Sequence, residues 1–449
     1  MHEKCAVFGI KSDSDVFDKI YYGLYAMQHR GQESAGIAIY KGKILSHKDM
    51  GLVSEVFKNT YIMGCSGIGH VRYSTRGVSE IDNAQPFVIN YAKGSFAIAH
   101  NGQIANSDEL KGVLENRGSV FTTTSDTEVI AHLIVREHIK TNDLVKGIRN
   151  AMGYLKGSYS LTLLFEDKII AVRDPYGIRP LVYGRSGNTH VFASESCALD
   201  VLDVELVRDV KPSEILVIGD KVESHLGVSE RTAHCMFEYV YFARPDSIIN
   251  GKSIYDVRKR LGAVLSKEGK VKADVVVPVP DSGITQAIGY SRESGIPFGE
   301  GLIKNRYIGR TFILPDHKQR VVSVRVKLNP IKSELKGKDI VLVDDSIVRG
   351  TTIKKLIKLL NESGANKVHV RISCPPLKYP CYYGIDMQSR KEFIAAQKSI
   401  EEIRDTIKAD SLVYTSIKGL VNAIGIPAEN LCMACLNCKY PVKDTQTKL

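Results

Sequence analysis

One stretch in the second half of the chain, KDIVLVDDSIVRGTTIKKL, constrains the fold more than any other. Residues 341–343 form a short apolar run that ends in two aspartates, and a loop containing Gly and Thr follows. Leu356, Ile357 and Leu360 then recur at helical spacing. A similar strand–turn–helix pattern, ADVVVPVPDSGITQAIGYS, precedes it. Two successive units of this kind with continuous apolar strands predict a parallel sheet buried on both faces.

The first half, up to about residue 230, has a different pattern. KGSFAIAHNGQI and GSYSLTLLFEDKIIAVRD carry the β-branched and aromatic bias of strands, broken by Gly and Asn turns. SDTEVIAHLIVREHI predicts a helix with Ser125 as its cap and Glu128 three residues later. These features predict an α+β domain, and we place it at residues 5–231. A second, α/β domain then spans 232–449, and the boundary between the two domains lies inside VESHLGVSERTAHCMFEYVYF.

Composition narrows the class of protein. The formal net charge is +11, but the basic residues are scattered and no zinc-finger, RRM-like or helix-turn-helix pattern is present. A highly phosphorylated small substrate would use the same charge, so we expect no nucleic-acid partner. No apolar stretch approaches the roughly 18 residues of a membrane helix, and no secretory signal is visible. We therefore expect a cytoplasmic protein without a membrane partner.

The loop after Asp344 and Asp345 suits an anion. A strand end that releases a Gly- and Thr-containing loop into a helix places backbone N–H groups and hydroxyls around a phosphate. Two adjacent carboxylates repel each other unless ribose hydroxyls or a cation bridge them. The alternative is an ordinary surface turn with solvated aspartates. The loop is not a P-loop, because G-x-x-x-x-G-K-[ST] is absent.

VLVDDSIVRGTT resembles the phosphoribosyl pyrophosphate (PRPP) motif of type I phosphoribosyltransferases. The resemblance implies that the two aspartates hold the ribose hydroxyls and that VPVPDSG supplies the pyrophosphate loop. The basic segment between these loops resembles a lid that closes on pyrophosphate; the alternative is a disordered linker. The implied PRPP-binding residues are Asp281, Ser282, Gly283, Lys304, Arg306, Arg310, Asp344, Asp345, Ser346, Ile347, Val348, Arg349, Gly350, Thr351 and Thr352. The implied Mg²⁺ ligands are Ser282, Asp344 and Asp345.

Polar, glycine-punctuated turns in the first half can be given chemical roles. The Arg72 guanidinium matches a substrate α-carboxylate, and Asp126 can hold an α-ammonium group. The Asn101 amide beside the Gly102 N–H makes a two-donor oxyanion hole. Taken singly, each of these residues is more typical of a structural role, since Asn-Gly is mainly a turn signal.

Together with CAVFGI, the fragments HVRYSTRG, HNG and TSD resemble the N-terminal-nucleophile glutaminase domain of class II amidotransferases. The resemblance implies a four-layer αββα fold with Cys5 as nucleophile. Its base would be its own α-amino group, with a pKa of about 7.7–8.0, once a propeptide of residues 1–4 is removed. The alternative is a buried thiol in a first strand. The implied glutamine-binding residues are Arg72, Tyr73, Thr75, Gly102 and Asp126, and the implied oxyanion hole is Asn101 and Gly102.

A glutaminase followed by a PRPP site resembles the family of glutamine PRPP amidotransferases. That family implies an enzyme that sends ammonia from glutamine to C1 of PRPP. The products are 5-phosphoribosylamine, glutamate and pyrophosphate, in the first committed step of purine synthesis. It also implies purine nucleotides as feedback inhibitors and a homo-oligomer, either dimer or tetramer. Two alternatives are a PRPP-binding regulator without chemistry and a class II amidotransferase with a different acceptor.

Cysteines gather near the C-terminus, where LCMACLNCKYP contains C-x₂-C-x₂-C. In a cytoplasmic protein this spacing indicates a metal or cluster rather than disulfides. A ferredoxin-type fourth cysteine is missing, so distant residues must complete any [4Fe–4S] site. Resemblance to the cluster-bearing branch of the family implies the ligands Cys235, Cys381, Cys432 and Cys435. Cys374 and Cys438 are then candidate substitutes. Structural Zn²⁺ is the alternative cofactor, and simple buried thiols are a further one.

Overall fold

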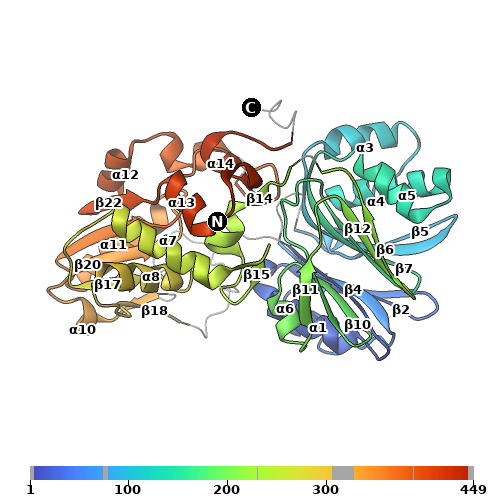
Figure 1. Ribbon diagram of the computed structural model, residues 1–449, viewed down its shortest axis with the longest axis horizontal. Helices are drawn as coiled ribbons and strands as arrows, with labels where there is room; N and C mark the ends of the chain where they lie inside the picture. The colour runs from blue at the N-terminus through green and yellow to red at the C-terminus, as the bar shows by residue number, and fades with distance from the viewer. Residues whose placement is uncertain (1–4, 74–78, 230, 306–327, 388, 443–449) are drawn as a thin grey trace.

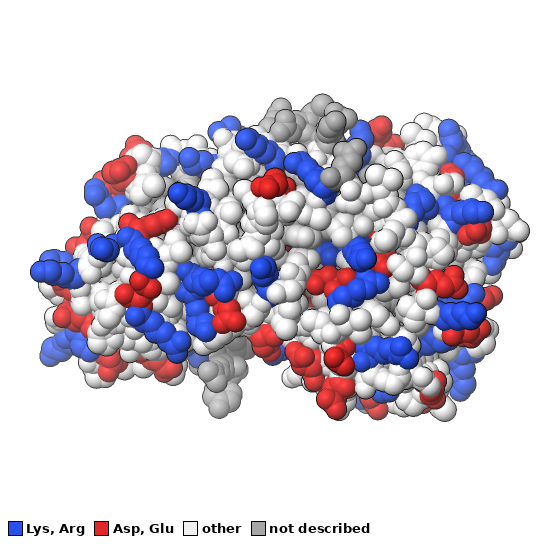
Figure 2. Space-filling view, in the orientation of Figure 1, with Lys and Arg blue, Asp and Glu red and all other residues white. Residues whose placement is uncertain are grey.

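The computed structural model describes residues 5–73, 79–229, 231–305, 328–387 and 389–442. Figure 1 shows two bodies side by side, the first half in blue to green and the second in yellow to red. Among the described residues, no helix is both long and apolar enough to cross a membrane. Basic and acidic side chains are interspersed over the face seen in Figure 2.

The first half contains two antiparallel sheets. The seven-stranded sheet has the order β11-β9-β10-β1-β4-β2-β3, and the six-stranded sheet has the order β13-β12-β8-β7-β6-β5. The strands of the first are β1 (Ala6–Lys11), β2 (Ser34–Tyr40), β3 (Ile44–Met50), β4 (Ser66–Arg72), β9 (Val182–Ser186), β10 (Thr189–Ala193) and β11 (Glu205–Asp209). Those of the second are β5 (Phe87–Tyr91), β6 (Gly94–Ile104), β7 (Gly157–Phe165), β8 (Lys168–Arg173), β12 (Glu214–Ile218) and β13 (Val222–Leu226).

Helices cover the outer faces of these sheets. Helix α1 (Phe17–Ala26) packs on the first sheet with the short α2 (Val53–Val56) and α6 (Cys197–Asp200). On the second sheet lie α3 (Ser107–Glu115), α4 (Asp126–Thr141) and α5 (Leu144–Met152). A separate apolar layer that includes Val7, Leu164 and Phe192 fills the space between the sheets. The predicted four-layer αββα architecture is therefore confirmed.

The predicted helix at Ser125 begins there, but its capping differs in detail. The Ser125 hydroxyl accepts a hydrogen bond from the Thr127 N–H at 3.3 Å. Glu128 does not complete a reciprocal box. Instead, its carboxylate accepts the N–H groups of Thr122 and Thr123, at 2.9 and 2.8 Å. Glu128 thus fixes the segment that leads into α4 rather than the cap itself.

The second half is built on the predicted parallel sheet, with the order β17-β20-β21-β22. Its strands are β17 (Val275–Pro278), β20 (Asp339–Asp344), β21 (Lys367–Ile372) and β22 (Ser411–Tyr414). Helices α7 (Ile254–Glu268) and α8 (Ile284–Ser294) cover one face, and α11 (Thr351–Glu362) and α12 (Ile400–Ile407) cover the other. Leu356, Ile357 and Leu360 on α11 are buried against the sheet, as their spacing predicts.

Short elements complete this half. They are β14 (His234–Cys235), the π-helix η3 (Glu238–Phe242), β15 (Ile248–Ile249), β16 (Lys252–Ser253), β18 (Leu302–Lys304), β19 (Leu328–Pro330), α10 (Lys332–Leu335), α13 (Ile417–Ile424), β23 (Leu431–Cys432) and α14 (Ala434–Asn437). Single 3₁₀ turns lie at η1 (Gln28–Arg30), η2 (Ile81–Asn83), η4 (Arg390–Glu392), η5 (Ile394–Ala396) and η6 (Ala428–Asn430). Strands β14 and β23 pair in parallel, so the C-terminal segment returns to the start of this half.

Candidate active sites and a buried cysteine cluster

Cys5 lies immediately before β1, beside the end of β4. Its sulfur is 3.6 Å from the carbonyl oxygen of Tyr73, and the residue is half-buried. Burial raises the pKa of the Cys5 thiol, although the hydrogen bond to Tyr73 and the charge of Arg72 oppose that shift. A thiol with a raised pKa is mostly protonated near neutral pH, so it needs a base to become a nucleophile.

Ser194 links β1, the strand that follows Cys5, to the predicted oxyanion hole. Its hydroxyl accepts the Val7 N–H at 3.0 Å and the Asn101 side-chain amide at 3.3 Å. Gly102 follows on β6, where an added Cβ would lie 2.1 Å from the Ser158 carbonyl oxygen. Only glycine fits so close to another backbone. The structure therefore brings Asn101 and Gly102 to the edge of the sandwich where Cys5 lies.

The two predicted recognition residues are also near the thiol. The charges of Arg72 and Asp126 both act on the Cys5 sulfur. One Asp126 carboxylate oxygen accepts the Ile104 N–H at 2.8 Å, and the other lies 3.6 Å from His100 Nδ1. Thr75, predicted to bind glutamine, lies outside the described residues, as do residues 1–4.

Sequence reasoning missed the acidic partner of Arg72. Nη1 of Arg72 lies 2.6 Å from the Glu33 carboxylate, and Arg72 is buried. Glu33 belongs to QHRGQESAGIA, which the sequence presents as a polar turn. A buried guanidinium needs a counter-charge. That rule predicts an acidic partner for Arg72 but does not say which residue it is.

A buried ion network behind Cys5 was missed as well. Arg30 donates through Nε to the Cys5 carbonyl oxygen at 3.3 Å and forms ion pairs with Glu195 and Glu238. Glu238 lies on η3 in the second half of the chain and also pairs with Arg179 at 3.2 Å. Burial alone would raise the pKa of Glu195, but His29 and Arg30 lower it below its ordinary value. The backbone of Cys5 is thus tied to the second half through paired charges.

The two predicted aspartates stand at the carboxyl end of β20. Asp344 and Asp345 are both buried, and the Asp345 N–H donates to the Asp344 carboxylate at 2.9 Å. Burial and the neighbouring Asp345 raise the pKa of Asp344 well above its usual range, while a hydrogen bond with Ser282 opposes the shift. The loop continues through Ser346, which donates to Asp345, to Gly350 at the start of α11.

The second predicted loop lies against the first. Gly283 immediately precedes α8, and an added Cβ there would meet the Val343 carbonyl oxygen at 2.4 Å. Asp281 forms an ion pair with Lys304. These two side chains line a cavity of about 540 Å³ together with Pro278, Pro280, Ile284, Phe298, Glu300, Leu302, Ile303, Asn305 and Asn329. Arg306 and Arg310, with most of the predicted lid, lie outside the described residues.

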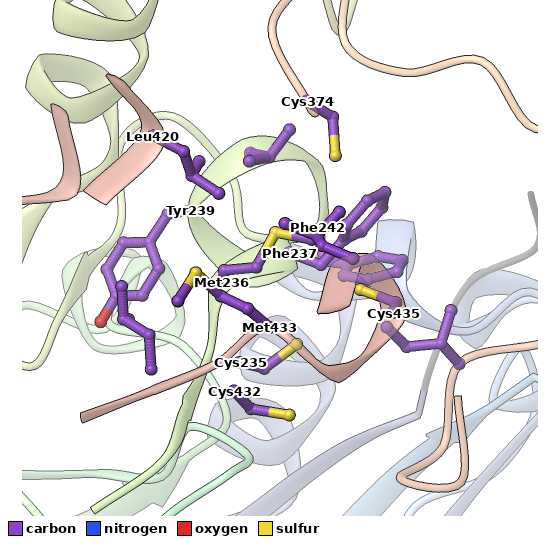
Figure 3. Packing of buried hydrophobic residues seen from close by; sticks show 14 of the residues in the cluster. Cys235, Met236, Phe237, Tyr239, Phe242, Cys374, Leu420, Cys432, Met433 and Cys435 are labelled. Atoms are coloured by element: carbon purple, nitrogen blue, oxygen red, sulfur yellow. The ribbon is translucent and has the colours of Figure 1, made fainter. Parts of the chain in front are cut away.

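Five buried cysteines share one apolar cluster, which consists of second-half residues together with Ile178 of the first half, and they are Cys235, Cys374, Cys381, Cys432 and Cys435. Cys235 pairs directly with Cys432 in the β14–β23 register, and Figure 3 shows both among packed methionine and aromatic side chains. Burial raises the pKa of Cys435 well above its usual range, and Cys374, Cys381, Cys432 and Cys235 raise it further. Ligand thiols must lose their protons when a metal binds, so these groups would become thiolates only with a bound cation or cluster to compensate their charge.

The two surplus cysteines occupy different places. The Cys374 N–H donates to the Asp345 carbonyl oxygen at 2.8 Å, which puts this thiol between the aspartate pair and the cluster. Cys438 is half-buried with a φ of 63°, a left-handed conformation that favours glycine. Within the described ranges, no three His, Cys, Asp or Glu side chains are grouped closely enough to hold a single metal ion.

Comparison with known proteins agrees with the two halves of the chain. Residues 70–201 match the glutamine amidotransferase domain family, and residues 246–396 match the phosphoribosyl transferase domain family. Amidophosphoribosyltransferase of Methanocaldococcus jannaschii is 53% identical over 98% of this chain and 98% of its own length. That of Bacillus subtilis is 45% identical over 99% and 95%.

Two solved structures agree along nearly the whole chain. One, described as the allosteric regulatory enzyme of purine biosynthesis, has a TM-score of 0.94 and 45% identity, covering 99% of this chain and 98% of its own. The other is glutamine PRPP amidotransferase from B. subtilis complexed with ADP and GMP. It has a TM-score of 0.94 and 44% identity, covering 99% of each chain. The chain belongs to the amidophosphoribosyltransferase family.

Proposed function

We propose that the Cys5 site hydrolyses glutamine and that the Asp344–Asp345 site transfers the released ammonia to C1 of PRPP. The observation that carries this proposal is the joint presence, in one chain, of Cys5 under the charges of Arg72 and Asp126 and of the aspartate pair. A regulator without chemistry would not need the first site. An amidotransferase with another acceptor would not need the second.

The first reaction follows from the geometry around Cys5. Arg72 and Asp126 bind the α-carboxylate and α-ammonium of glutamine. The thiolate of Cys5 attacks the side-chain amide carbon, and Asn101 and Gly102 stabilise the oxyanion. Ammonia leaves, and water then hydrolyses the thioester to glutamate. The α-amino group of Cys5 serves as base once residues 1–4 are removed, because its nitrogen is otherwise a peptide nitrogen without basicity.

The second reaction depends mainly on position and charge. Asp344 and Asp345 hold the ribose hydroxyls, and the loop of residues 346–352 binds the 5′-phosphate at the start of α11. Residues 281–283 form the pyrophosphate loop, and Lys304 neutralises charge at its edge. Mg²⁺, bound through Ser282 and the aspartates, would supply positive charge for the pyrophosphate group. Ammonia reaches C1 inside the protein and displaces pyrophosphate, giving 5-phosphoribosylamine.

Coupling between the sites gives the decisive test of this function. Glutamate release from glutamine should rise sharply when PRPP and Mg²⁺ are added together to anaerobically purified protein. The physical reason is that the nucleophile's backbone is tied to the second half through Arg30 and Glu238. Release that is indifferent to PRPP would mean that the acceptor is misassigned. A complete lack of release, with residues 1–4 shown by mass spectrometry to be absent, would contradict the glutaminase assignment.

The cofactor at the cysteine cluster is proposed to be [4Fe–4S]; structural Zn²⁺, the alternative, needs several of these thiols on one ion, and the described residues contain no such group. Its four ligands would be Cys235, Cys381, Cys432 and Cys435, which lie in one buried cluster. The thiolates would bind the iron atoms, and the role would be structural, holding the C-terminal segment across the second half.

Elemental analysis distinguishes the two cofactors. We expect about four iron and four sulfide per chain in anaerobically purified protein, and loss of iron in Cys235→Ser. Cys374→Ser and Cys438→Ser should keep the iron, because these two thiols are not in the proposed ligand set. Cys197→Ser is the matched control, since Cys197 is a buried thiol outside this cluster. Stoichiometric zinc without iron would contradict the iron–sulfur assignment.

Purine nucleotides are proposed as feedback inhibitors, supported by the solved relative that was complexed with ADP and GMP. The homo-oligomeric state, the cytoplasmic location and the domain bounds 5–231 and 232–449 stay predictions.

A further inference from the structure

A loop of the second half, residues 381–387, lies against the strand that carries Asn101 and Gly102. The Gly384 N–H donates to the side-chain carbonyl of Gln103 at 3.2 Å. The Tyr383 carbonyl oxygen accepts the Ser158 hydroxyl at 2.9 Å and also the Arg179 guanidinium. These three contacts join two adjacent loop residues to β6, to β7 and to the segment after β8.

The same loop makes a contact that only glycine permits. Gly384 has a φ of +86°, and an added Cβ would lie 2.9 Å from both the carbonyl carbon and the carbonyl oxygen of Gly102. A Cβ added at Gly102 would itself lie 2.1 Å from the Ser158 carbonyl oxygen. The Gly102 backbone is thus packed closely against both Gly384 and Ser158, and the Tyr383 carbonyl accepts the Ser158 hydroxyl.

The loop is braced by its own hydrogen bonds. The Tyr383 N–H donates to the Cys381 sulfur at 3.4 Å, and the Cys381 N–H donates to the Met387 carbonyl oxygen at 2.9 Å. Cys381, Tyr383 and Met387 are all buried. A loop closed in this way is a firm support, and a residue that shifts it also shifts Gly102.

We infer that Gly384 and Gln103 are positioning residues for the glutaminase reaction, because they hold the Gly102–Gln103 peptide in place and so fix, across the Gly102 Cα, the adjoining Gly102 N–H that serves the oxyanion hole. The inference rests on the proposed role of Gly102. Oxyanion-hole donors act only from a narrow range of positions, and loss of one costs about 10²–10³ in kcat. The second half of the chain therefore completes the geometry of a site that the first half carries.

Gly384→Ala tests this support directly. The new methyl group would lie 2.9 Å from the Gly102 carbonyl and 3.0 Å from Arg179 Nη2, and we expect the Gly102 carbonyl to shift, so kcat for glutamine hydrolysis should fall about 10- to 100-fold. The KM for glutamine should stay within about twofold, since Arg72 and Asp126 are untouched. Ammonia-dependent synthesis and the rate of Cys5 alkylation by iodoacetamide should also stay within about twofold of the parent enzyme.

Gly118→Ala is the matched control. Gly118 has a φ of +89°, close to that of Gly384, but nothing lies within 4 Å of its added Cβ. It carries the same left-handed strain without the contact, and its kcat should match that of the parent enzyme. Gln103→Met changes the β6 partner instead of the loop. It removes the acceptor of the Gly384 N–H, leaves the sequence of residues 381–387 unchanged, and should also lower kcat.

Three results would overturn the inference. One is a kcat in Gly384→Ala equal to that of Gly118→Ala. Another is an equal loss of glutamine-dependent and ammonia-dependent synthesis, which would show a merely structural role. The third is an unchanged kcat in Gln103→Met. Asn101→Ala separates this inference from the proposed function. If that variant hydrolyses glutamine normally, the oxyanion hole itself is misassigned. If it is inactive while Gly384→Ala is normal, only the supporting role fails.

Discussion

Replacing Cys5 with alanine should abolish glutamine-dependent synthesis of 5-phosphoribosylamine and leave synthesis from ammonia intact. Removing the nucleophile of a covalent mechanism costs at least about 10⁴-fold in kcat, because no neighbouring group can form the thioester. The proposed acceptor site, at Asp344 and Asp345, lies in the other half of the chain, so free ammonia should still react there. The measurement is the rate of pyrophosphate release with glutamine or with ammonium chloride as nitrogen donor.

Cys65→Ala is the control for this prediction. Cys65 is an exposed thiol that lies just before β4, and its replacement should change neither rate. Equal loss of both activities in Cys5→Ala would indicate that the residue supports the fold rather than the chemistry. Retention of glutamine-dependent synthesis would exclude Cys5 as the nucleophile.

The second large effect is expected at the aspartate pair. Asp344→Asn should lower synthesis about 10²-fold with either nitrogen donor, because a hydrogen bond to a charged group is worth about 1.5–3 kcal/mol. Hydrolysis of glutamine without PRPP should be unaffected, since the Cys5 site does not use this residue. Steady-state rates of synthesis with glutamine and with ammonia test the first expectation. The rate of glutamate release without PRPP tests the second.

The same substitution should stabilise the protein when no ligand is bound. Burial and Asp345 raise the pKa of Asp344 in the folded state. The folded protein therefore holds this proton more tightly than the unfolded chain, and stability falls as pH rises from the unfolded pKa, about 3.9, through the raised folded value. Asp344→Asn removes this penalty at neutral pH, and each kcal/mol gained should raise Tm by about 2–4 °C.

Thermal unfolding at several pH values checks this stabilisation. The Tm difference between variant and parent should be largest at neutral or higher pH and should shrink under acid conditions, where Asp344 is neutral. Asp339→Asn, at the opposite end of β20, is the control, because Asp339 is only half-buried and pairs with Lys367. A lower Tm in Asp344→Asn at neutral pH would contradict the assigned repulsion.

Local pattern was sufficient for much of the fold. The run at residues 341–343, the aspartates after it and the spacing of Leu356 and Leu360 predict a strand, a loop and a helix. The structure has them as β20 and α11. The αββα architecture of the first half came from resemblance of short motifs, not from periodicity. Capping of α4 was predicted at the right residue, but the partners of Glu128 depend on how the preceding loop folds back.

The sequence by itself determined which chemical groups are present and which elements carry them, namely Cys5, Arg72, Asn101, Gly102 and Asp126 in one half and the aspartate pair in the other. The roles of these residues remain predictions, although the structure brings each set together. Only the tertiary structure decided what surrounds them. Glu33 on Arg72, Glu238 on Arg30 and Gly384 on Gly102 join residues from 39 to more than 200 positions apart. Local sequence periodicity does not predict such contacts, because the partners meet only when the layers pack. Burial and charge balance then select them.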